Sequence, residues 1–457
     1  MPDTSWTVMI YMAGDNNLSD ESVYALTEMK KAAPGGRVKV VVQFDPKDDY
    51  LPTHRFEINR GGNRGALVED MLSKAPFKPE DESSVARVIE ARRGADAERE
   101  TETDTGNPDT LFNFLSLCLE RYPAEHYMVV IAGHGSGTER DFLLRDESPA
   151  GYLTINELKG VFRDLQSKFR DADGNPLVID ILGMDVCLMS MAEICYDLRG
   201  LVQIAVSNES YSPASGWPYQ AALGRLPEFA KAGPGTPEKL EQERVGFARA
   251  LVEEYVNFYS DYWLGGLSVD QSALDVRKVE GLGEVVRELA AALEAGLTQQ
   301  ASKDAIVLAH WEAQSYNGEQ YVDLYDFCDC LLKRSAAGPV ATACQRVKDF
   351  LSPGNFVVKS CYSGPEFQYS YGVSIYFPWD DVAPSYGSLD FAGSSGWGRF
   401  LQAYTKETRR GPRGVEKEPK LGIMNLTNEV RKVGGRKVGG RGRENPIRSM
   451  RNPPIVA

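Results

Sequence analysis

Hydrophobic positions in the first half of the chain follow two alternating periods. Short apolar runs of strand length predict buried strands at Trp6–Ala13, Arg37–Phe44, Met128–Ala132, Val178–Leu182 and Leu201–Val206. Segments between them, with apolar residues three and four positions apart, predict helices at Ser19–Ala33, 108–121, 154–170 and 188–199. This regular alternation predicts an α/β fold, with a mostly parallel sheet covered by helices on both faces.

The second half is less regular. Its pattern predicts helices at 237–260, 275–295, 321–335 and 339–351, and strands at 265–270, 355–361 and 371–377. A small hairpin is expected within 53–72, and a charged surface loop at 79–106. No clear boundary precedes residue 240, so the sheet is expected to extend across it. We therefore divide the chain into a core at 1–235, a remaining part of the same unit at 236–408, and a tail at 409–457.

Composition limits the class of protein. Hydrophobic residues make up 42% and charged residues 25%, as in soluble globular proteins. No apolar run reaches the roughly 20 residues needed to span a bilayer, and the N-terminus lacks the features of a signal peptide. Seven scattered cysteines do not form a disulfide framework. These features predict a cytoplasmic protein without a membrane partner, or a secreted one only if a leader has been removed.

The net charge of −14 is unevenly distributed. Residues 409–457 hold 13 Lys and Arg against 4 Asp and Glu, a balance of +9, which leaves −23 for residues 1–408. Nucleic acid is a poor partner for such an acidic body, because its phosphates are bound through positive charge. The tail repeats RKVGG in tandem at 431–440 and has few apolar residues, so it is predicted to be disordered.

Two residues share a setting that suits catalysis. His134 follows the predicted strand MVVIA, and Cys187 follows the predicted strand VIDIL. In an open parallel sheet, catalytic groups collect at the carboxyl ends of the strands. If these strands are neighbours, the two side chains lie within a few ångströms of each other.

The chemistry of the two residues is compatible with nucleophilic catalysis. A thiolate is the nucleophilic form of cysteine, and a helix predicted from Leu188 would favour that form through its macrodipole. His134 is suited to take the thiol proton and to return it to a leaving amine. Gly135 lets the backbone turn, so that its N–H and that of Cys187 can form an oxyanion hole.

Each residue alone has an ordinary structural explanation, since a buried Cys is usually a small hydrophobic residue. Their paired placement favours catalysis, because the chain has only four histidines and the other three lack such a setting. Other motifs are absent from the sequence: it has no nucleotide-binding glycine motif, no HExxH, and no zinc-site partners for Cys328 and Cys330.

Four segments resemble a known family. They are TVMIYMAGDNNL near the N-terminus, MDVCLMSMAEI around Cys187, SNESYSPASGWPYQ at 207–220 and YGVSIYFPW at 371–379. In this order, and across roughly residues 5–405, they resemble the clostripain family of cysteine peptidases, within the caspase-like clan.

The resemblance implies a caspase-like three-layer α/β/α sandwich and a Cys187–His134 dyad that acts through a thioester acyl-enzyme, without an obligatory third member. It also implies cleavage after Arg or Lys, and therefore substrates that carry basic residues. That preference requires a carboxylate in the pocket, and Asp185 matches the family's position for it. The alternative for Asp185 is a cap on the following helix.

Further residues on the same rim are candidates for substrate binding: Asn16, Ser207, Glu209 and Trp217. Asn16 has the alternative of a turn, and Trp217 that of the core. Self-processing is expected at Arg140 or Arg145, between the His and the Cys, as in family members, although both are also ordinary solvated charges. The basic tail is a further candidate for self-trimming or for occupying the acidic cleft.

Some questions stay open at this stage. No cofactor is required by the chemistry, and calcium, on which some relatives depend, has no EF-hand loop to bind it here. The oligomeric state is unknown. Two alternative functions are a caspase-like peptidase of other specificity and a catalytically silent module that binds basic peptides.

Overall fold

The computed structural model describes residues 3–47, 52–64, 66–74, 103–147, 150–171, 173–231, 235–261, 267–334 and 338–409. Most of the predicted loop at 79–106 and almost all of the tail at 409–457 lie outside the described residues.

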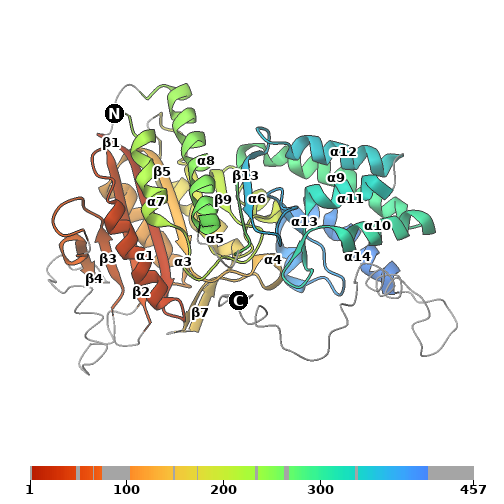
Figure 1. Cartoon of the computed structure of the whole chain (residues 1–457), viewed down its shortest axis with the longest axis horizontal. Helices are drawn as coiled ribbons and strands as arrows, with labels where there is room; N and C mark the ends of the chain where they lie inside the picture. Colours follow the sequence, from red (N-terminus) through yellow and green to blue (C-terminus); the bar gives the residue numbers. More distant parts are fainter. Residues whose placement is uncertain are drawn as a thin grey trace.

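Within that described part, nine strands form one central sheet in the order β13-β10-β9-β8-β5-β1-β2-β3-β4 (Figure 1). Their bounds are β1 Thr4–Gly14, β2 Val38–Pro46, β3 His54–Glu57, β4 Met71–Lys74, β5 Ala124–Ala132, β8 Ile179–Asp185, β9 Val202–Ser207, β10 Val269–Asp275 and β13 Val357–Ser363. The strands from β9 to β2 are parallel, and antiparallel pairs complete both edges. The predicted hairpin within 53–72 is the β3–β4 pair.

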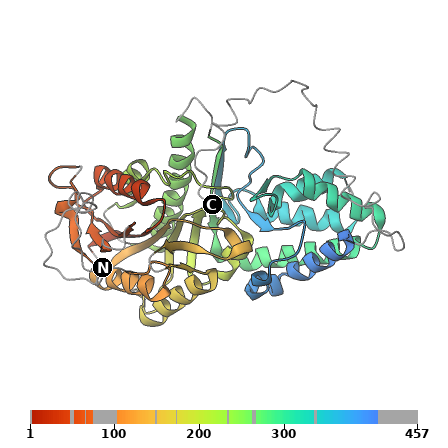
Figure 2. The same cartoon turned by 90° about the horizontal axis from the view of Figure 1, so that it is seen from below.

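Helices cover both faces of this sheet, as Figure 2 shows. Side chains of β1 alternate, so that Val8, Ile10 and Met12 pack on one face and Met9 and Tyr11 on the other. The first face is covered by α1 Ser19–Ala32, α7 Tyr219–Arg225 and α8 Pro237–Asp261. The second is covered by α3 Pro108–Arg121, α5 Ile155–Lys168 and α6 Ala192–Asp197. The predicted three-layer α/β/α sandwich is confirmed.

A further group of helices lies beside the sheet (Figure 1). They are α9 Val279–Gly296, α10 Gln300–Glu312, α11 Leu324–Arg334, α12 Pro339–Leu351, α13 Asp390–Ser394 and α14 Trp397–Arg409. A small sheet of β11 Ser315–Tyr316, β12 Tyr321–Asp323 and β14 Ser374–Tyr376 lies among them. These elements share one hydrophobic core with α3, α5 and α6. Because β10 and β13 extend the central sheet, its expected continuation past residue 240 is confirmed.

Several local predictions were wrong. The helix expected from Leu188 begins only at Ala192, because Leu188 has a left-handed φ of 65° and the N–H groups of Met189 and Ser190 donate to the Asn208 carbonyl. The strand expected at 265–270 is β10, which begins only at Val269 and runs to Asp275. In the segment 321–335, expected to be all helix, the first three residues form β12 and the helix α11 begins at Leu324. The sequence signal also missed the hairpin of β6 Leu143–Glu147 and β7 Ala150–Leu153.

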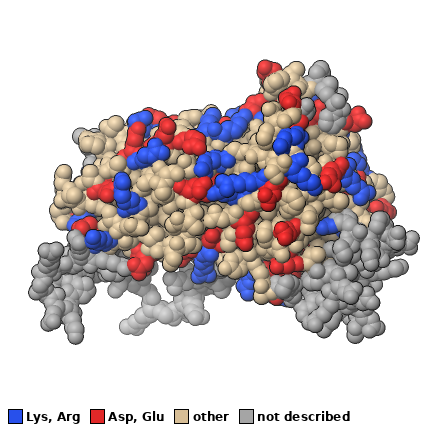
Figure 3. Space-filling model, turned by 180° about the vertical axis from the view of Figure 1, so that it is seen from behind, with Lys and Arg blue, Asp and Glu red and all other residues tan. Residues whose placement is uncertain are grey.

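No helix among the described residues is long and apolar enough to cross a bilayer. On the face shown in Figure 3, acidic and basic side chains are intermingled.

Candidate active site

His134 and Cys187 hold equivalent places on neighbouring strands. Ala132 of β5 pairs with Asp185 of β8, so each residue lies two positions past the last pair. The Gly133 N–H extends the pairing by donating to the Asp185 carbonyl over 3.2 Å. A Cβ added to Gly135 would lie 3.0 Å from the Cys187 carbonyl oxygen, so the two loops are in contact. The structure brings the two residues together at the predicted edge of the sheet.

The His134 ring is buried and held from one side. Its Nε2 lies 2.8 Å from Asn17 Oδ1, and because an amide oxygen only accepts, Nε2 carries the hydrogen and Nδ1 the lone pair. Nδ1 is buried and has no hydrogen-bond partner among the described residues. Burial, and then the nearby Arg145, lower the pKa of His134 to about 4. The ring is therefore neutral at physiological pH, with Nδ1 ready to accept a proton.

Cys187 is buried beside the loop that follows β9. The Ser212 N–H donates to its Sγ over 3.3 Å. Burial raises the pKa of the Cys187 thiol to about 12, against the effect of that N–H, so the resting group is a thiol. The prediction that a helix macrodipole lowers this pKa was wrong, because α6 begins five residues later, at Ala192.

Cys187 and Asp185 line the same pocket. Its walls come from the start of α1, the carboxyl ends of β1, β5 and β8, and residues 212–216. The candidate nucleophile and the family-matched carboxylate therefore border one small cavity of about 40 Å³.

Asp185 is fixed in this pocket by neighbours from the same loop. Its Oδ2 accepts hydrogen bonds from the Trp217 N–H (3.1 Å) and the Tyr219 hydroxyl (2.9 Å). Only glycine suits position 216, since its φ is +64° and a Cβ would lie 2.8 Å from Asp185 Oδ2. Burial raises the pKa of Asp185 to about 6, although both hydrogen bonds oppose the rise. The alternative that Asp185 caps a helix is wrong, because no helix begins beside it.

Gly135 lies in a short bridge opposite Leu143. The flanking bonds run from the Leu144 N–H to the His134 carbonyl and from the Ser136 N–H to the Phe142 carbonyl. Neither uses the Gly135 N–H, and Gly135 lies beside Cys187.

Two of the predicted rim residues, Asn16 and Trp217, are used inside the fold. Asn16 is fully buried, where its Nδ2 donates to the Ala13 and Arg145 carbonyls and its Oδ1 accepts from the Leu18 N–H. It makes the turn that was its alternative, and the prediction that it contacts substrate is corrected. The Trp217 ring packs against Gly183 in the core, and only its backbone N–H reaches Asp185.

Ser207 and Glu209 are also buried, and neither borders the pocket. Ser207 lies opposite Ser272 of β10, inside the sheet. Glu209 Oε2 accepts from the Gly372 N–H over 2.8 Å, and the carboxyl group is hydrogen-bonded to Asp323. Their predicted contact with substrate is corrected, because later parts of the chain cover them.

Arg140 and Arg145 are exposed, as self-processing sites need to be. Arg140 ends the short helix α4 Gly137–Arg140, while Arg145 lies in β6. The Arg145 carbonyl accepts a hydrogen bond from Asn16. Cleavage after Arg145 would therefore require local opening of the hairpin.

Some site residues were missed from the sequence. Ser212 and Gly216 contact Cys187 or Asp185, and Glu21 lines the pocket. Asn17, which follows the first strand on the same rim as Asn16, was not missed, and it contacts His134. The others lie in loops or on a helix whose orientation the pattern does not fix.

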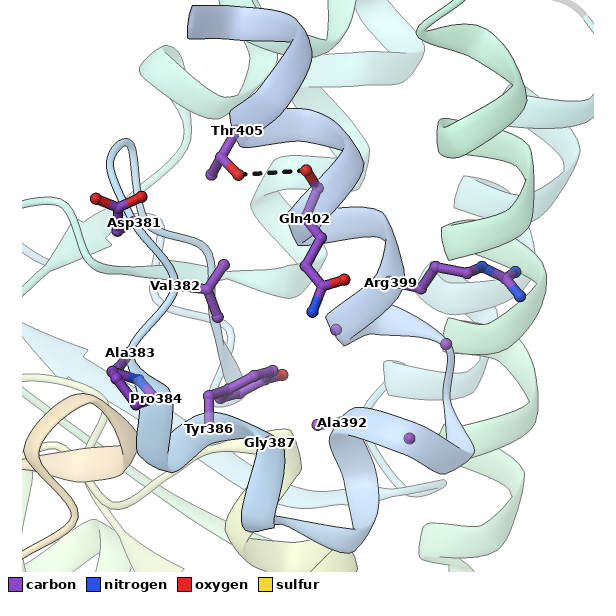
Figure 4. Close-up of a pocket in the computed structure, with 13 residues that line it drawn as sticks. Asp381, Val382, Ala383, Pro384, Tyr386, Gly387, Ala392, Arg399, Gln402 and Thr405 are labelled. Atoms are coloured by element: carbon purple, nitrogen blue, oxygen red, sulfur yellow. Dashed lines mark hydrogen bonds between the residues drawn. The ribbon is translucent and has the colours of Figure 1, made fainter.

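A larger cavity of about 690 Å³ lies far along the chain, between α14 and residues 381–396 (Figure 4). No Cys or His lines it, and Arg399 at its edge donates to Glu294 over 2.8 Å. It offers no nucleophile or base for the same chemistry. Among the described residues, no three His, Cys, Asp or Glu side chains are arranged to hold a metal ion.

Comparison with known proteins finds relatives in sequence and in fold. Clostripain from Hathewaya histolytica is 23% identical over 389 residues, which cover 72% of this chain but only 65% of clostripain. Two solved structures share the fold. A secreted C11 cysteine protease from Bacteroides thetaiotaomicron, in complex with an irreversible peptide inhibitor, has a TM-score of 0.59 at 16% identity, covering 86% of this chain and 99% of its own. An inactive zymogen C11 protease from Parabacteroides distasonis has a TM-score of 0.57 at 18% identity, with the same coverage.

A sequence model described as the clostripain family matches residues 10–402, which is most of the chain. On this match the chain belongs to the clostripain family of cysteine peptidases.

Proposed function

We propose that the chain is a cysteine endopeptidase that cleaves peptide bonds after Arg or Lys, with Cys187 as the nucleophile and His134 as the general base. The observation that carries the proposal is the pocket shared by Cys187 and Asp185. A nucleophile beside a buried carboxylate suits a substrate whose basic side chain enters the pocket next to its scissile bond.

In the first step, Cys187 Sγ attacks the carbonyl carbon of the basic residue while His134 Nδ1 takes the thiol proton. Both groups rest in their neutral forms, with pKa values of about 12 and 4, so the transfer accompanies the attack. The Gly135 N–H stabilises the oxyanion of the tetrahedral intermediate. Asn17 Oδ1 accepts from Nε2–H and stabilises the imidazolium that forms.

In the second step, His134 gives its proton to the leaving amine, the C–N bond breaks, and a thioester links the substrate to Cys187. Water then attacks the thioester carbonyl and gives a proton to His134. The C–S bond breaks and releases the new carboxyl terminus, and His134 returns the proton to the Cys187 sulfur. The side chains supply the nucleophile and the acid–base groups, so we propose that no cofactor or calcium ion is required. Full activity after dialysis against EDTA would support this, and recovery only on adding calcium would refute it.

Fluorogenic peptides ending in Arg, Lys, Asp or Asn test the specificity, with Cys187→Ala as the control. We expect cleavage of the Arg and Lys peptides only, and none by the control variant. Cleavage after Asp or Asn would instead indicate a caspase-like peptidase of different specificity. Binding of basic peptides without any cleavage would indicate a silent binding module.

Self-processing after Arg140 or Arg145 is a further part of the proposal. Because the Asn16 bond holds the Arg145 carbonyl, Arg140 is the less constrained of the two sites. Intact-mass comparison of the purified protein with Cys187→Ala would reveal fragments that end at either residue. Loss of the basic tail would appear in the same spectra. The predicted cytoplasmic location is a separate expectation, since one solved relative is described as secreted.

A further inference from the structure

We infer that Glu21 is a second acidic residue of the substrate pocket and favours Arg over Lys before the scissile bond. The inference rests on the proposed function, because it concerns the same pocket. Glu21 lies in the first turn of α1 and lines the pocket together with Asp185 and Cys187. The pocket therefore has carboxylates from two different elements, the end of β8 and the start of α1.

The local structure of α1 leaves Glu21 available to the pocket. A Glu at this helical position often turns back to accept the N–H of the residue that caps the helix. Here Leu18 occupies the capping position, and its N–H donates instead to Asn16 Oδ1 over 2.9 Å. The turn made by Asn16 thus replaces the bond that would otherwise hold Glu21 on its own helix.

The Glu21 carboxylate also has a hydrogen-bonding need that the described residues do not meet. Its Oε2 is shielded from solvent and has no hydrogen-bond partner among them. A buried acceptor without a donor is costly, and most such atoms in proteins are paired. A cationic ligand in the pocket would supply the missing donor once the Glu21 side chain turns Oε2 toward it.

The two basic side chains differ in how many acceptors they can use. Asp185 Oδ2 is already engaged by the Trp217 N–H and the Tyr219 hydroxyl, so this atom has little remaining capacity. A guanidinium has five N–H donors fixed in a plane and can reach two carboxylates at once. An ammonium is a compact charge on a flexible chain, and one carboxylate serves it well. A second acid therefore benefits Arg more than Lys.

Glu21→Gln tests this role, with kcat/KM measured on matched Arg and Lys peptides. Asp20→Asn is the matched control, because Asp20 is exposed on the same turn, carries the same charge and does not line the pocket. We expect Glu21→Gln to lower kcat/KM about tenfold for the Arg peptide and only about twofold for the Lys peptide, as loss of a charged hydrogen bond predicts. Asp20→Asn should leave the Arg-to-Lys ratio unchanged.

The outcomes separate this inference from the proposed function. An unchanged ratio in Glu21→Gln, or an equal loss on both peptides, would overturn the role of Glu21 while the proposed function stands. Failure of the wild-type protein to cleave either basic peptide would overturn both. The rate of Cys187 alkylation by iodoacetamide and the melting temperature establish that the variant keeps an intact site.

Discussion

Acidic residues lie in two places at the same edge of the central sheet, Asp185 at the pocket and Glu209 with Asp323 and Asp270, and their surroundings differ. Asp185 ends β8 and Glu209 follows β9, so strand-end position made both candidates for substrate binding, and the family resemblance favoured Asp185 alone. Burial raises the pKa of both carboxyl groups. Asp185 borders a pocket and is 8% exposed, whereas Glu209 is completely buried.

The two groups differ because later parts of the chain cover Glu209 and leave Asp185 beside a pocket. Asp323 of β12 and the Gly372 N–H both bond the Glu209 carboxyl group, while Asp270 of β10 accepts from the Glu209 and Ser210 N–H groups. These contacts close the end of β9. The end of β8 is bordered instead by α1 and residues 212–216, which leave a pocket. The same edge thus contains a pocket lined by Asp185 and Cys187 and a closed cluster of buried acids.

The largest expected difference is in substrate specificity. Asp185→Asn should lower kcat/KM for Arg and Lys peptides about 100-fold or more, because it removes the charge that faces the basic side chain. Glu209→Gln, the matched change in the other group, should leave the preference for basic peptides as it is. Steady-state kinetics with both variants tests this. Comparable loss of specificity in Glu209→Gln would show that the two groups are not distinct.

A smaller effect is expected at His134. Asn17→Ala should lower kcat about tenfold, since the ring loses the acceptor that orients it. Asn17→Asp keeps an oxygen acceptor and adds a negative charge, which stabilises the imidazolium, so the pKa of His134 should rise. The acid limb of the pH–kcat profile reports this pKa. A limb that does not move in Asn17→Asp would contradict contact between the two residues during catalysis.

The pH dependence should distinguish the pocket acid from the base. Asp185 must be ionised to bind a cation, and its pKa is about 6, so kcat/KM for Arg peptides should rise through that pH. From pH 5 to pH 7 the ionised fraction, and with it kcat/KM, grows about tenfold. His134, with a pKa of about 4, is already neutral over this range. A flat profile between pH 5 and 7 would rule out Asp185 as the recognising charge.

The smallest effect concerns stability in the structural cluster. Burial raises the pKa of Asp323 to about 7 and that of Glu209 well above its usual range. Both acids keep their protons in the folded state after the unfolded chain has ionised near pH 4, so the free energy of unfolding should fall as the pH rises from about 4 to 7 and beyond.

Glutamine at position 209 cannot ionise. The Glu209→Gln variant therefore lacks the fall in the free energy of unfolding that Glu209 contributes as the pH rises. The melting temperature of Glu209→Gln relative to wild type should therefore rise by about 2 °C or more between pH 5 and pH 8. A constant difference across that range would show that Glu209 does not retain a proton.

The sequence predicted the features that depend on local pattern. Apolar runs and helical spacing gave the alternation of the sandwich, and strand ends placed His134 and Cys187 on one rim. The family resemblance added Asp185. Strand-end position alone could not show that Glu209 and Ser207 are covered, because their burial is caused by β10, β12 and residue 372, which lie far along the chain.

The turn at Cys187 was also beyond local pattern. Residues 188–199 have helical spacing, but the Asn208 carbonyl captures the N–H groups of Met189 and Ser190 and delays the helix. Similarly, the role of Glu21 depends on which neighbour caps α1. The bonds to the Asn208 carbonyl join residues well apart along the chain, whereas the Asn16–Leu18 bond is local, and apolar spacing predicts neither. Bonds from β10, β12 and residue 372 decided which acids remain accessible.

The assignment of the nucleophile and its pocket can be tested in one experiment. A peptidyl chloromethyl ketone with Arg next to the reactive group, and its counterpart with Asp, are each incubated with the protein, and the modified residue is identified by mass spectrometry. The proposal predicts alkylation of Cys187 by the Arg reagent, little reaction with the Asp reagent, and loss of this preference in Asp185→Asn. Alkylation of another residue, or equal reaction with both reagents, would contradict it.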